Sequence, residues 1–468
     1  MLAGVLAGGL LAATLGCGAA LTLQSGGDPA EASLGPTEVV APRMFRQALD
    51  NDQDLQYFGN MIVGGQLVKG IFDTGSIEFA VLSKACDPQY CGSTKPLYDS
   101  KSSSEYKHGP LELQLSYGSG SLFAKEAYDT VLIGDMKASV APFWEVVDAD
   151  MVLLIESSFN AIVGLGPIPT NVEVLSPNHR ELEKDEHMFA VLQKRMMIDK
   201  FSVCLGREPG SYGYLTWNDN AAERLPKLFS KLHIPESGYW MAKIKDVRLG
   251  RYRACQRGCG AVIDSGTSLL AAPAEEQARL SELINSMVGD CGSLDKLPDL
   301  TFTLDGRKYS LPPDSYVGEV FNEAPEELAK NFKLARSSLI GGARGETKKK
   351  CEASLMEIGM SSDFGPVWIL GVPFFRKYYT IFEQATETSP PAIYTALASD
   401  GCTPHDPRES EMLGGHRQGT TVRRIDASRL RMGHWIHRAS ASNTSYMEAH
   451  HHTVGRTHGS NRTRAKTA

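Results

Sequence analysis

The sequence predicts a strand-rich protein of two similar lobes, because one short pattern occurs twice in it. Residues 73–76 read Asp-Thr-Gly-Ser and residues 264–267 read Asp-Ser-Gly-Thr, each at the end of an apolar run. Each copy is followed about a hundred residues later by two aliphatic residues and a glycine, at 162–164 and 369–371. The 45 glycines among 468 residues favour strands joined by tight turns over helices.

The pattern of apolar residues predicts the elements in order along the chain. Two strands are expected at 58–63 and 68–72, separated by a Gly-Gly turn. Residues 111–117 alternate apolar and polar side chains before the sequence Gly-Ser-Gly-Ser, and residues 121–127 can pair back as a hairpin. The other expected elements are helices at 185–199 and 275–288, strands at 201–205 and from 239, a hairpin of 301–304 with 308–311, a connection at 226–235 and a surface insertion at 324–350.

The amino-terminal part of the chain has the composition of a processed leader. Residues 1–23 carry no charged side chain, and an apolar centre is followed by small residues around Cys17. This predicts a secretory signal peptide, with an uncleaved membrane anchor as the alternative. Residues 24–54 are rich in Gly, Pro, Ala and Glu, which predicts a short propeptide or flexible lead-in.

The carboxyl-terminal residues 403–468 differ from the rest of the chain. They hold 11 basic and 5 acidic side chains and eight of the twelve histidines, whereas the whole chain has a net charge of −7. With few aliphatic residues and no sustained period, this region is expected to be a disordered, solvated tail. Its sequons at Asn443 and Asn461 would be glycosylated in a secretory compartment. No groove-reading or aromatic motif accompanies the positive charge, so we expect no nucleic-acid partner.

Asp73 and Asp264 are the candidate catalytic residues. Two similar lobes that each contribute one carboxyl group would place the pair in a shared site. Two adjacent carboxyls do not both ionise easily, so they hold one proton between them and can activate water. This chemistry predicts proteolysis without a metal or a cofactor. The motifs Gly-x-Ser-x-Gly and His-Glu-x-x-His are absent from the sequence, so a serine hydrolase or a metalloprotease is not supported.

Further motifs accompany the two aspartates over about residues 55 to 400, and together they resemble the pepsin-like aspartic proteases. The resemblance implies an all-β, bilobal fold with a cleft between an N-terminal lobe at 55–228 and a C-terminal lobe at 229–402. It also implies an aspartic endopeptidase that acts as a monomer on protein or peptide substrates. The motifs are Tyr-Phe-Gly at 57–59, Tyr-Gly-Ser-Gly-Ser at 117–121, Phe-Ser-Val at 201–203, Ser-Leu-Leu at 268–270, Leu-Pro-Asp at 297–299, Trp-Ile-Leu-Gly at 368–371 and Tyr-Tyr-Thr at 378–380.

The neighbours of the two aspartates have expected roles. Gly75 and Gly266 let the backbone come close to substrate and to the other lobe. Thr74 and Ser265 would bond across to the opposite loop and hold the carboxyls coplanar, or else only satisfy their own turns. Ser76 and Thr267 would bond the outer carboxylate oxygens, with the same alternative.

Substrate contacts are expected from a flap and an apolar pocket. The resemblance implies that Tyr117 closes over a bound peptide, with Gly118 and Ser119 contacting it; the alternative is an exposed hairpin aromatic. An apolar pocket would select bulky hydrophobic side chains around the scissile bond, although its members are equally suited to the core. The expected pocket residues are Ile71, Leu153, Phe159 and Ile162.

Cysteine usage indicates an oxidising compartment, because the nine cysteines leave eight after loss of Cys17. We therefore expect a secreted, endolysosomal or vacuolar protein. Free buried thiols are the alternative, and no Cys-x2-Cys pair supports zinc. The resemblance implies the disulfides Cys86–Cys91, Cys255–Cys259 and Cys291–Cys351, which leaves Cys204 and Cys402 as a fourth candidate pair.

The sequence also departs from the family pattern. Ala80 stands where many relatives place a tryptophan that bonds the flap tyrosine, so the flap is expected to be held less firmly. Val372 stands where many relatives place an aspartate, which predicts a less acidic activity optimum than that of pepsin. A catalytically silent binding protein on the same fold is the alternative function, but Asp73, Asp264 and Tyr117 are all present.

Overall fold

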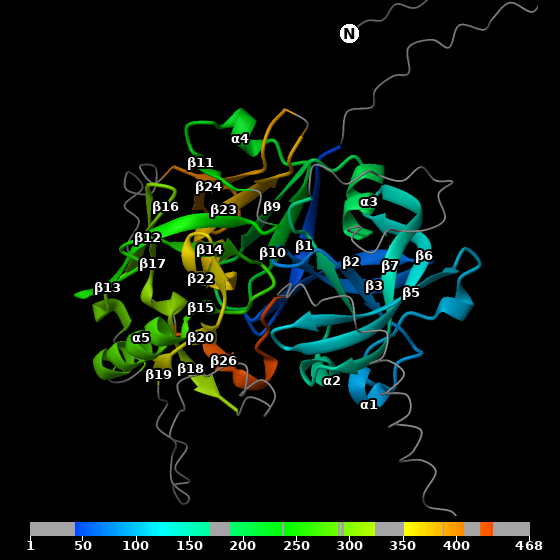
Figure 1. Ribbon diagram of the computed structural model, residues 1–468, viewed down its shortest axis with the longest axis horizontal. Helices are drawn as coiled ribbons and strands as arrows, with labels where there is room; N and C mark the ends of the chain where they lie inside the picture. The colour runs from blue at the N-terminus through cyan, green and yellow to red at the C-terminus, as the bar shows by residue number, and fades with distance from the viewer. Residues whose placement is uncertain are drawn as a thin grey trace, which may run out of the picture. The chain divides into compact units, whose positions relative to one another are not determined.

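Strands dominate the structure, as the sequence predicts. The computed structural model describes residues 43–168, 188–235, 238–288, 291, 294–322, 351–386, 388–406 and 422–433. The all-β, bilobal class is confirmed by two large sheets, one of 14 and one of 9 strands (Figure 1). Among these residues no helix has the length and apolar character needed to span a membrane. The expected signal peptide, the insertion at 324–350 and both sequons lie outside the described residues.

The N-terminal lobe is formed by seven strands in the order β2-β3-β8-β4-β7-β6-β5. The predicted hairpin is present as β5 and β6, which meet at the pair Tyr117 and Gly120. The bounds are β2 Gln56–Val63, β3 Gln66–Asp73, β4 Phe79–Leu82, α1 Pro88–Cys91, a 3-10 turn Ser100–Ser102, β5 Lys107–Tyr117, β6 Gly120–Ile133, β7 Met136–Asp150, α2 Leu153–Glu156, β8 Ala161–Gly164, α3 Met188–Arg195 and α4 Ala221–Arg224.

The C-terminal lobe follows a related plan, with its strands in the order β17-β16-β12-β14-β22-β15-β20. β13 pairs with β12, β21 pairs with β22, and helix α5 follows β15. The bounds are β12 Met241–Leu249, β13 Tyr252–Ala254, β14 Cys259–Ile263, β15 Leu270–Pro273, α5 Ala274–Met287, a 3-10 turn Leu294–Lys296, β16 Leu300–Leu304, β17 Arg307–Leu311, a 3-10 turn Pro313–Ser315, β18 Val317–Phe321, β19 Cys351–Ala353, β20 Leu355–Ile358, β21 Ser361–Ser362, β22 Gly365–Leu370 and α7 Val372–Lys377.

Strands from both halves of the chain form one continuous run in the larger sheet. Its order is β11-β24-β23-β9-β10-β1, and β9 pairs with β23 at Val203 and Thr380. The rings of Phe201 and Phe382 stack on this run with centroids 5.1 Å apart. Buried aromatic pairs of this kind add to the energy of area burial, so they tie the two lobes together. The bounds are β1 Phe45–Asp52, β9 Lys200–Leu205, β10 Gly213–Trp217, β11 Ser230–His233, β23 Tyr378–Glu383, β24 Ala392–Ala398 and β25 Pro404–His405, the last paired with β24.

The repeated sequence pattern is a repeated three-strand unit. In the first copy β3 runs parallel to β8, which pairs antiparallel with β4; in the second, β14 runs parallel to β22, which pairs antiparallel with β15. The distant glycine of each copy is needed for space. A Cβ on Gly164 would lie 2.5 Å from the backbone N of Glu78, and one on Gly371 would lie 2.1 Å from the carbonyl oxygen of Leu269. The loop after each aspartate therefore passes directly against its partner glycine.

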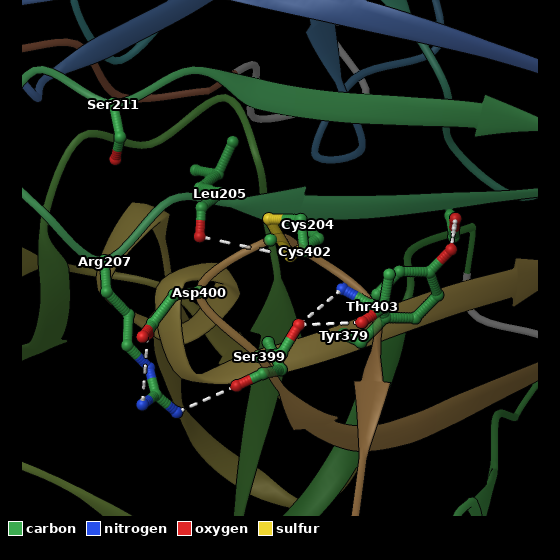
Figure 2. Close-up of a disulfide and its surroundings, with 12 residues drawn as sticks. Cys204, Leu205, Arg207, Ser211, Tyr379, Ser399, Asp400, Cys402 and Thr403 are labelled. Atoms are coloured by element: carbon green, nitrogen blue, oxygen red, sulfur yellow. Dashed lines mark hydrogen bonds and ion pairs between the residues drawn. A yellow bond between two sulfur atoms is a disulfide. The ribbon is translucent and has the colours of Figure 1, made fainter.

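Four disulfides are present: Cys86–Cys91, Cys255–Cys259, Cys291–Cys351 and Cys204–Cys402. The last joins β9 to the turn after β24 across 198 residues, and Figure 2 shows its surroundings. Beside it, Arg207 donates to the carbonyl oxygen of Ala398 at 2.9 Å and lies 3.7 Å from the Asp400 carboxylate. Because a cross-link over a long loop restricts the unfolded chain most, this disulfide stabilises the sheet shared by both lobes.

Two stretches differ from the sequence-based expectation. Residues 45–52, expected in a flexible lead-in, form β1, in which residues 45–49 pair with β10 and residues 50–52 pair with β2. Residues 422–433, expected in an unstructured tail, form β26 (Arg424–Asp426), a 3-10 turn (Ala427–Arg429) and an extended end. β26 pairs with β18 at the edge of a three-stranded sheet with β19 (Figure 1). Both stretches lack a period of their own, and their order comes from pairing with strands far away in the sequence.

Candidate active site

Asp73 and Asp264 occupy equivalent positions in the two repeated units. Asp73 is the last residue of β3, and Asp264 directly follows β14. Both side chains are fully buried, and each carboxyl lies directly against the loop of the other. Two carboxyls in this arrangement share a proton, because ionising both would place two like charges in a poorly solvated space. The structure thus brings the two candidate catalytic residues together.

The side chains next to the aspartates lock the two loops to each other. The Thr74 hydroxyl donates to the carbonyl oxygen of Ile263 at 2.9 Å and accepts from the backbone N–H of Ser265 at 2.9 Å. In the reverse direction, the Ser265 hydroxyl donates to the carbonyl oxygen of Phe72 at 2.6 Å and accepts from the backbone N–H of Thr74 at 3.1 Å. Each hydroxyl bonds across to the other loop, and four hydrogen bonds fix the distance between the carboxyls.

Gly75 and Gly266 allow each loop to pass against the opposite carboxyl. A Cβ on Gly75 would lie 2.5 Å from Cγ of Asp264, and one on Gly266 would lie 2.1 Å from Oδ1 of Asp73. Any larger residue would therefore push the pair apart. The Gly75 backbone N–H also donates to Asp73 Oδ1 at 2.9 Å, and the Gly266 N–H donates to Asp264 Oδ1 at 2.7 Å.

The two outer hydroxyls are placed differently. The Thr267 hydroxyl donates to Asp264 Oδ2 at 2.5 Å, which fixes the orientation of that carboxyl. The buried Ser76 hydroxyl lies close enough to Asp73 to lower its pKa, but it makes no hydrogen bond of normal geometry. The expected symmetry between these two residues is therefore incomplete.

A residue that the sequence analysis left in the tail lies directly on the pair. Nη2 of Arg431 is 2.6 Å from Asp73 Oδ2, and its Nη1 donates to the carbonyl oxygen of Gly266 at 2.5 Å. The arginine is 1% exposed. The signal in the sequence is weak: Leu430 and Met432 flank it within a polar, basic region.

The charges around the pair shift the two carboxyls in opposite directions. Burial raises the pKa of Asp73, but the charge and hydrogen bond of Arg431 outweigh it and leave that pKa below its ordinary value. Burial and the neighbouring Asp73 charge raise the pKa of Asp264 well above its ordinary value. In this arrangement Asp73 is ionised and the shared proton resides on Asp264.

The hairpin of β5 and β6, expected to act as the flap, has Gly118 and Ser119 at its tip. Tyr117 is 6% exposed, so it is not an exposed hairpin aromatic, and the Arg431 guanidinium carbon lies 5.9 Å from the centre of its ring. Burial raises the pKa of the Tyr117 hydroxyl, with a further contribution from the charge of Asp73. The flap tyrosine therefore lies near the carboxyl pair.

The four expected pocket residues are buried in the core of the N-terminal lobe. Ile71 on β3 pairs with Ile162 on β8, next to the position of Asp73. Leu153 begins α2, and Phe159 precedes β8. All four are at most 4% exposed. In this structure they are part of the apolar core. The space above the carboxyls is occupied by residues of the tail.

Two residues near the flap were not anticipated from the sequence. Trp144 on β7 pairs with Ala80 on β4, and its indole N–H donates to Glu78 Oε2 at 2.7 Å. Burial raises the pKa of Glu78 to about 7, although the indole hydrogen bond lowers it. A tryptophan therefore does lie beside Ala80, but it comes from β7 and its indole N–H is bonded to the carboxyl group of Glu78.

Val372 is the first residue of α7 and is 1% exposed. Its backbone N–H donates to the carbonyl oxygen of Thr267 at 2.9 Å, so it lies against the second aspartate loop. An apolar side chain here adds no charge to the surroundings of Asp264.

Comparison with known proteins agrees with this geometry. The family model for eukaryotic aspartyl protease matches residues 56–327. Renin of Rattus norvegicus is 28% identical over 360 residues, covering 74% of this chain and 81% of the relative. Pepsin A of Bos taurus is 27% identical over 355 residues (74% and 86%), and cathepsin E-B of Xenopus laevis is 26% identical over 349 residues (72% and 79%). With its two carboxyls on paired, repeated loops, the chain belongs to the eukaryotic aspartyl protease family and is an aspartic-type endopeptidase.

Proposed function

We propose that Asp73 and Asp264 are the acid–base pair with which this enzyme hydrolyses peptide bonds. The observation that supports this most strongly is that two fully buried carboxyls lie against each other's loops, which are locked together by hydrogen bonds. A pair that holds one proton contains both a base and an acid, which is what addition of water to an amide requires.

In the proposed reaction a water molecule lies between the two carboxyls. The ionised carboxylate accepts a proton from this water while the oxygen of the water attacks the scissile carbonyl carbon. The protonated carboxyl donates its proton to the carbonyl oxygen, and a tetrahedral diol forms without a covalent enzyme intermediate. Collapse of the diol delivers one proton to the leaving nitrogen and restores the single shared proton on the pair.

Substrate binding is assigned to the flap and to the apolar residues beneath it. The backbone of Gly118 and the hydroxyl of Ser119 are free to bond a peptide main chain once the tail is withdrawn. Closure of Tyr117 over the peptide would exclude water from the carboxyls. A preference for bulky hydrophobic residues around the scissile bond, expected from Ile71, Leu153, Phe159 and Ile162, stays a prediction, because all four are buried in the core here.

The compartment follows from the disulfides. Four disulfides form and persist in an oxidising environment, which supports a place in the secretory pathway, either outside the cell or in an endolysosomal or vacuolar compartment. One relative, from Arthroderma benhamiae and 27% identical, is named "Probable vacuolar protease A".

Cleavage of an unfolded protein between about pH 2 and pH 8 tests the proposal. Three samples are compared: the wild-type chain, the Asp264→Asn variant and the wild-type chain with pepstatin, a peptide inhibitor of carboxyl pairs. We expect cleavage that both the substitution and the inhibitor abolish. Absence of cleavage in every sample, after acid treatment as well, would favour a binding protein that uses the same fold.

A further inference from the structure

Residues 429–433 lie across the aspartate pair in the manner of a bound peptide. We propose that the C-terminal segment 422–433, through these residues, is a built-in ligand of the cleft, which competes with substrates and lowers the activity of the protease until the segment is displaced or cut. This inference rests on the proposed function, since it concerns the same cleft. It goes beyond that function because it assigns an occupant and a mode of control.

The first contact of this ligand blocks the position of the reacting water. Arg431 reaches Asp73 Oδ2 at 2.6 Å and the carbonyl oxygen of Gly266 at 2.5 Å, and both groups are buried. A guanidinium bound to the carboxylate takes the lone pairs that would accept the proton of water. Burying an arginine costs free energy unless a partner offsets the loss of water. The carboxylate of Asp73 and the carbonyl oxygen of Gly266 are the partners that allow Arg431 to be buried here.

The second contact covers the other carboxyl. The backbone N–H of Gly433 donates to the Thr267 hydroxyl at 3.1 Å, and a Cβ on Gly433 would lie 2.6 Å from Asp264 Oδ2. The main chain therefore passes so close to Asp264 that only glycine fits without displacement. Arg431 and Gly433 together leave neither carboxyl open to a substrate.

Main-chain hydrogen bonds hold the segment from above and below. From the flap, the Gly118 N–H donates to the carbonyl oxygen of Gly433 at 3.1 Å, and Ser119 Oγ accepts from the Met432 N–H at 2.9 Å. On the opposite side, the Ser268 N–H donates to the carbonyl oxygen of Arg431 at 2.9 Å, and its hydroxyl accepts from the Arg431 N–H at 3.0 Å. These are the main-chain groups by which an extended peptide is recognised.

Ion pairs and apolar contacts anchor the segment outside the cleft. Nη1 of Arg423 lies 3.0 Å from the Asp54 carboxylate, and Nη1 of Arg429 lies 2.9 Å from that of Asp52. The segment is also covalently part of the chain, so its effective concentration at the cleft is high. Buried apolar residues of the segment pack in one cluster with residues of the C-terminal lobe: Ile425, Ala427, Leu430 and Met432 with Leu269, Ala271, Met356 and Ile369.

Two full-length variants release the segment by different routes. Arg431→Ala removes the partner of Asp73, and Gly433→Val pushes the main chain away from Asp264. Arg424→Lys is the matched control: this arginine of the same segment lies 3.9 Å from the Glu319 carboxylate with 65% of its side chain exposed, and the substitution keeps its charge. The measurements are the affinity for labelled pepstatin and kcat/KM for cleavage of an unfolded protein.

We expect both release variants to bind pepstatin about tenfold or more tightly than the wild-type chain, and the control to match the wild type. Cleavage should rise in parallel. Tighter pepstatin binding without any cleavage would uphold the segment as a ligand while refuting the proposed function. Equal pepstatin binding by the wild type and both variants, or no binding by any of them, would overturn the inference, because the segment would then not be what excludes a peptide.

A second measurement on the wild-type chain avoids any substitution. Hydrogen exchange should show protected amides at Met432 and Gly433 that lose protection when pepstatin is added in excess. Continued protection of these amides while pepstatin is bound would contradict the inference. This result is decisive even where a variant does not fold.

Discussion

The two aspartate loops share a backbone plan but differ in what faces them. At the first loop, Asp73 faces the Arg431 guanidinium, whereas at the second, Asp264 faces the Thr267 hydroxyl and the main chain of Gly433. Burial raises the pKa of both carboxyls, but Arg431 outweighs it at Asp73 and leaves that pKa below its ordinary value. At Asp264, burial and the charge of Asp73 outweigh the lowering by the Thr267 hydrogen bond, and the pKa lies above its ordinary value. The repeated motif thus supplies the pair, while Arg431, which lies outside the motif, favours the proton on Asp264.

Removing one carboxyl at a time is expected to have the largest effect on activity. Asp73→Asn and Asp264→Asn should each lower kcat by at least about a thousandfold, because the pair loses either its charge or its proton. The two variants should differ in the C-terminal segment. Asp73→Asn removes the ionic partner of Arg431 and should expose the Met432 amide to hydrogen exchange, whereas Asp264→Asn should leave it protected. Equal exchange in both would contradict the assigned contacts.

Acid should weaken the hold of the segment. The pKa of Asp73 is lowered in the folded chain, so its ion pair with Arg431 is fully present above the ordinary value of 3.8 and is lost as the pH falls through the lowered pKa. The groups that face this contact are Asp264, Tyr117 and, beyond the tyrosine, Glu78.

The measurement is the pepstatin affinity of the wild type relative to Arg431→Ala. The advantage of the variant, about tenfold near pH 6, should shrink as the pH falls below 3.8 and through the lowered pKa of Asp73. A ratio that stays constant with pH would show that Asp73 does not control the segment.

Loss of the hydrogen bonds between the two loops is expected to have a smaller effect, on the stability of the fold. Thr74→Val and Ser265→Ala each remove a hydroxyl that makes two hydrogen bonds across the loops, and each should lower the free energy of unfolding by about 1–3 kcal/mol. Ser265→Thr keeps the hydroxyl and serves as the conservative control. Denaturant unfolding of the three variants gives the comparison, and an unchanged midpoint for Ser265→Ala would argue against these bonds.

The smallest expected effect concerns the pH profile of activity. Val372→Asp would add a buried carboxyl against the loop of Asp264, as many relatives have. As a protonated hydrogen-bond donor it would stabilise the ionised pair, lower its pKa and move the optimum toward lower pH by about one unit or less. The wild-type optimum should accordingly be less acidic than that of pepsin. A wild-type profile that peaks near about pH 2 would contradict this expectation.

Much of the site could be predicted from sequence because it is local. Residues 73–76 and 264–267 each lie at the end of a buried strand. Their small side chains allow the two loops to come into contact. Gly164 and Gly371 were visible as distant partners of these loops, and the structure supplies the reason: a side chain there would strike the backbone. The cysteine pairs could also be predicted, from the resemblance to the family and from their spacing.

The position of Arg431 was decided by the tertiary structure alone. The arginine and Asp73 are 358 residues apart, and residues 422–433 are too short and too polar to fold by themselves. The segment becomes ordered because β18 offers a free edge, because the C-terminal lobe offers apolar surface, and because buried Asp73 offers an unpaired charge. β1 illustrates the same rule, since its order comes from β10 and β2. The sequence by itself determined the carboxyl pair and the two lobes around it, whereas long-range pairing determined what occupies the cleft.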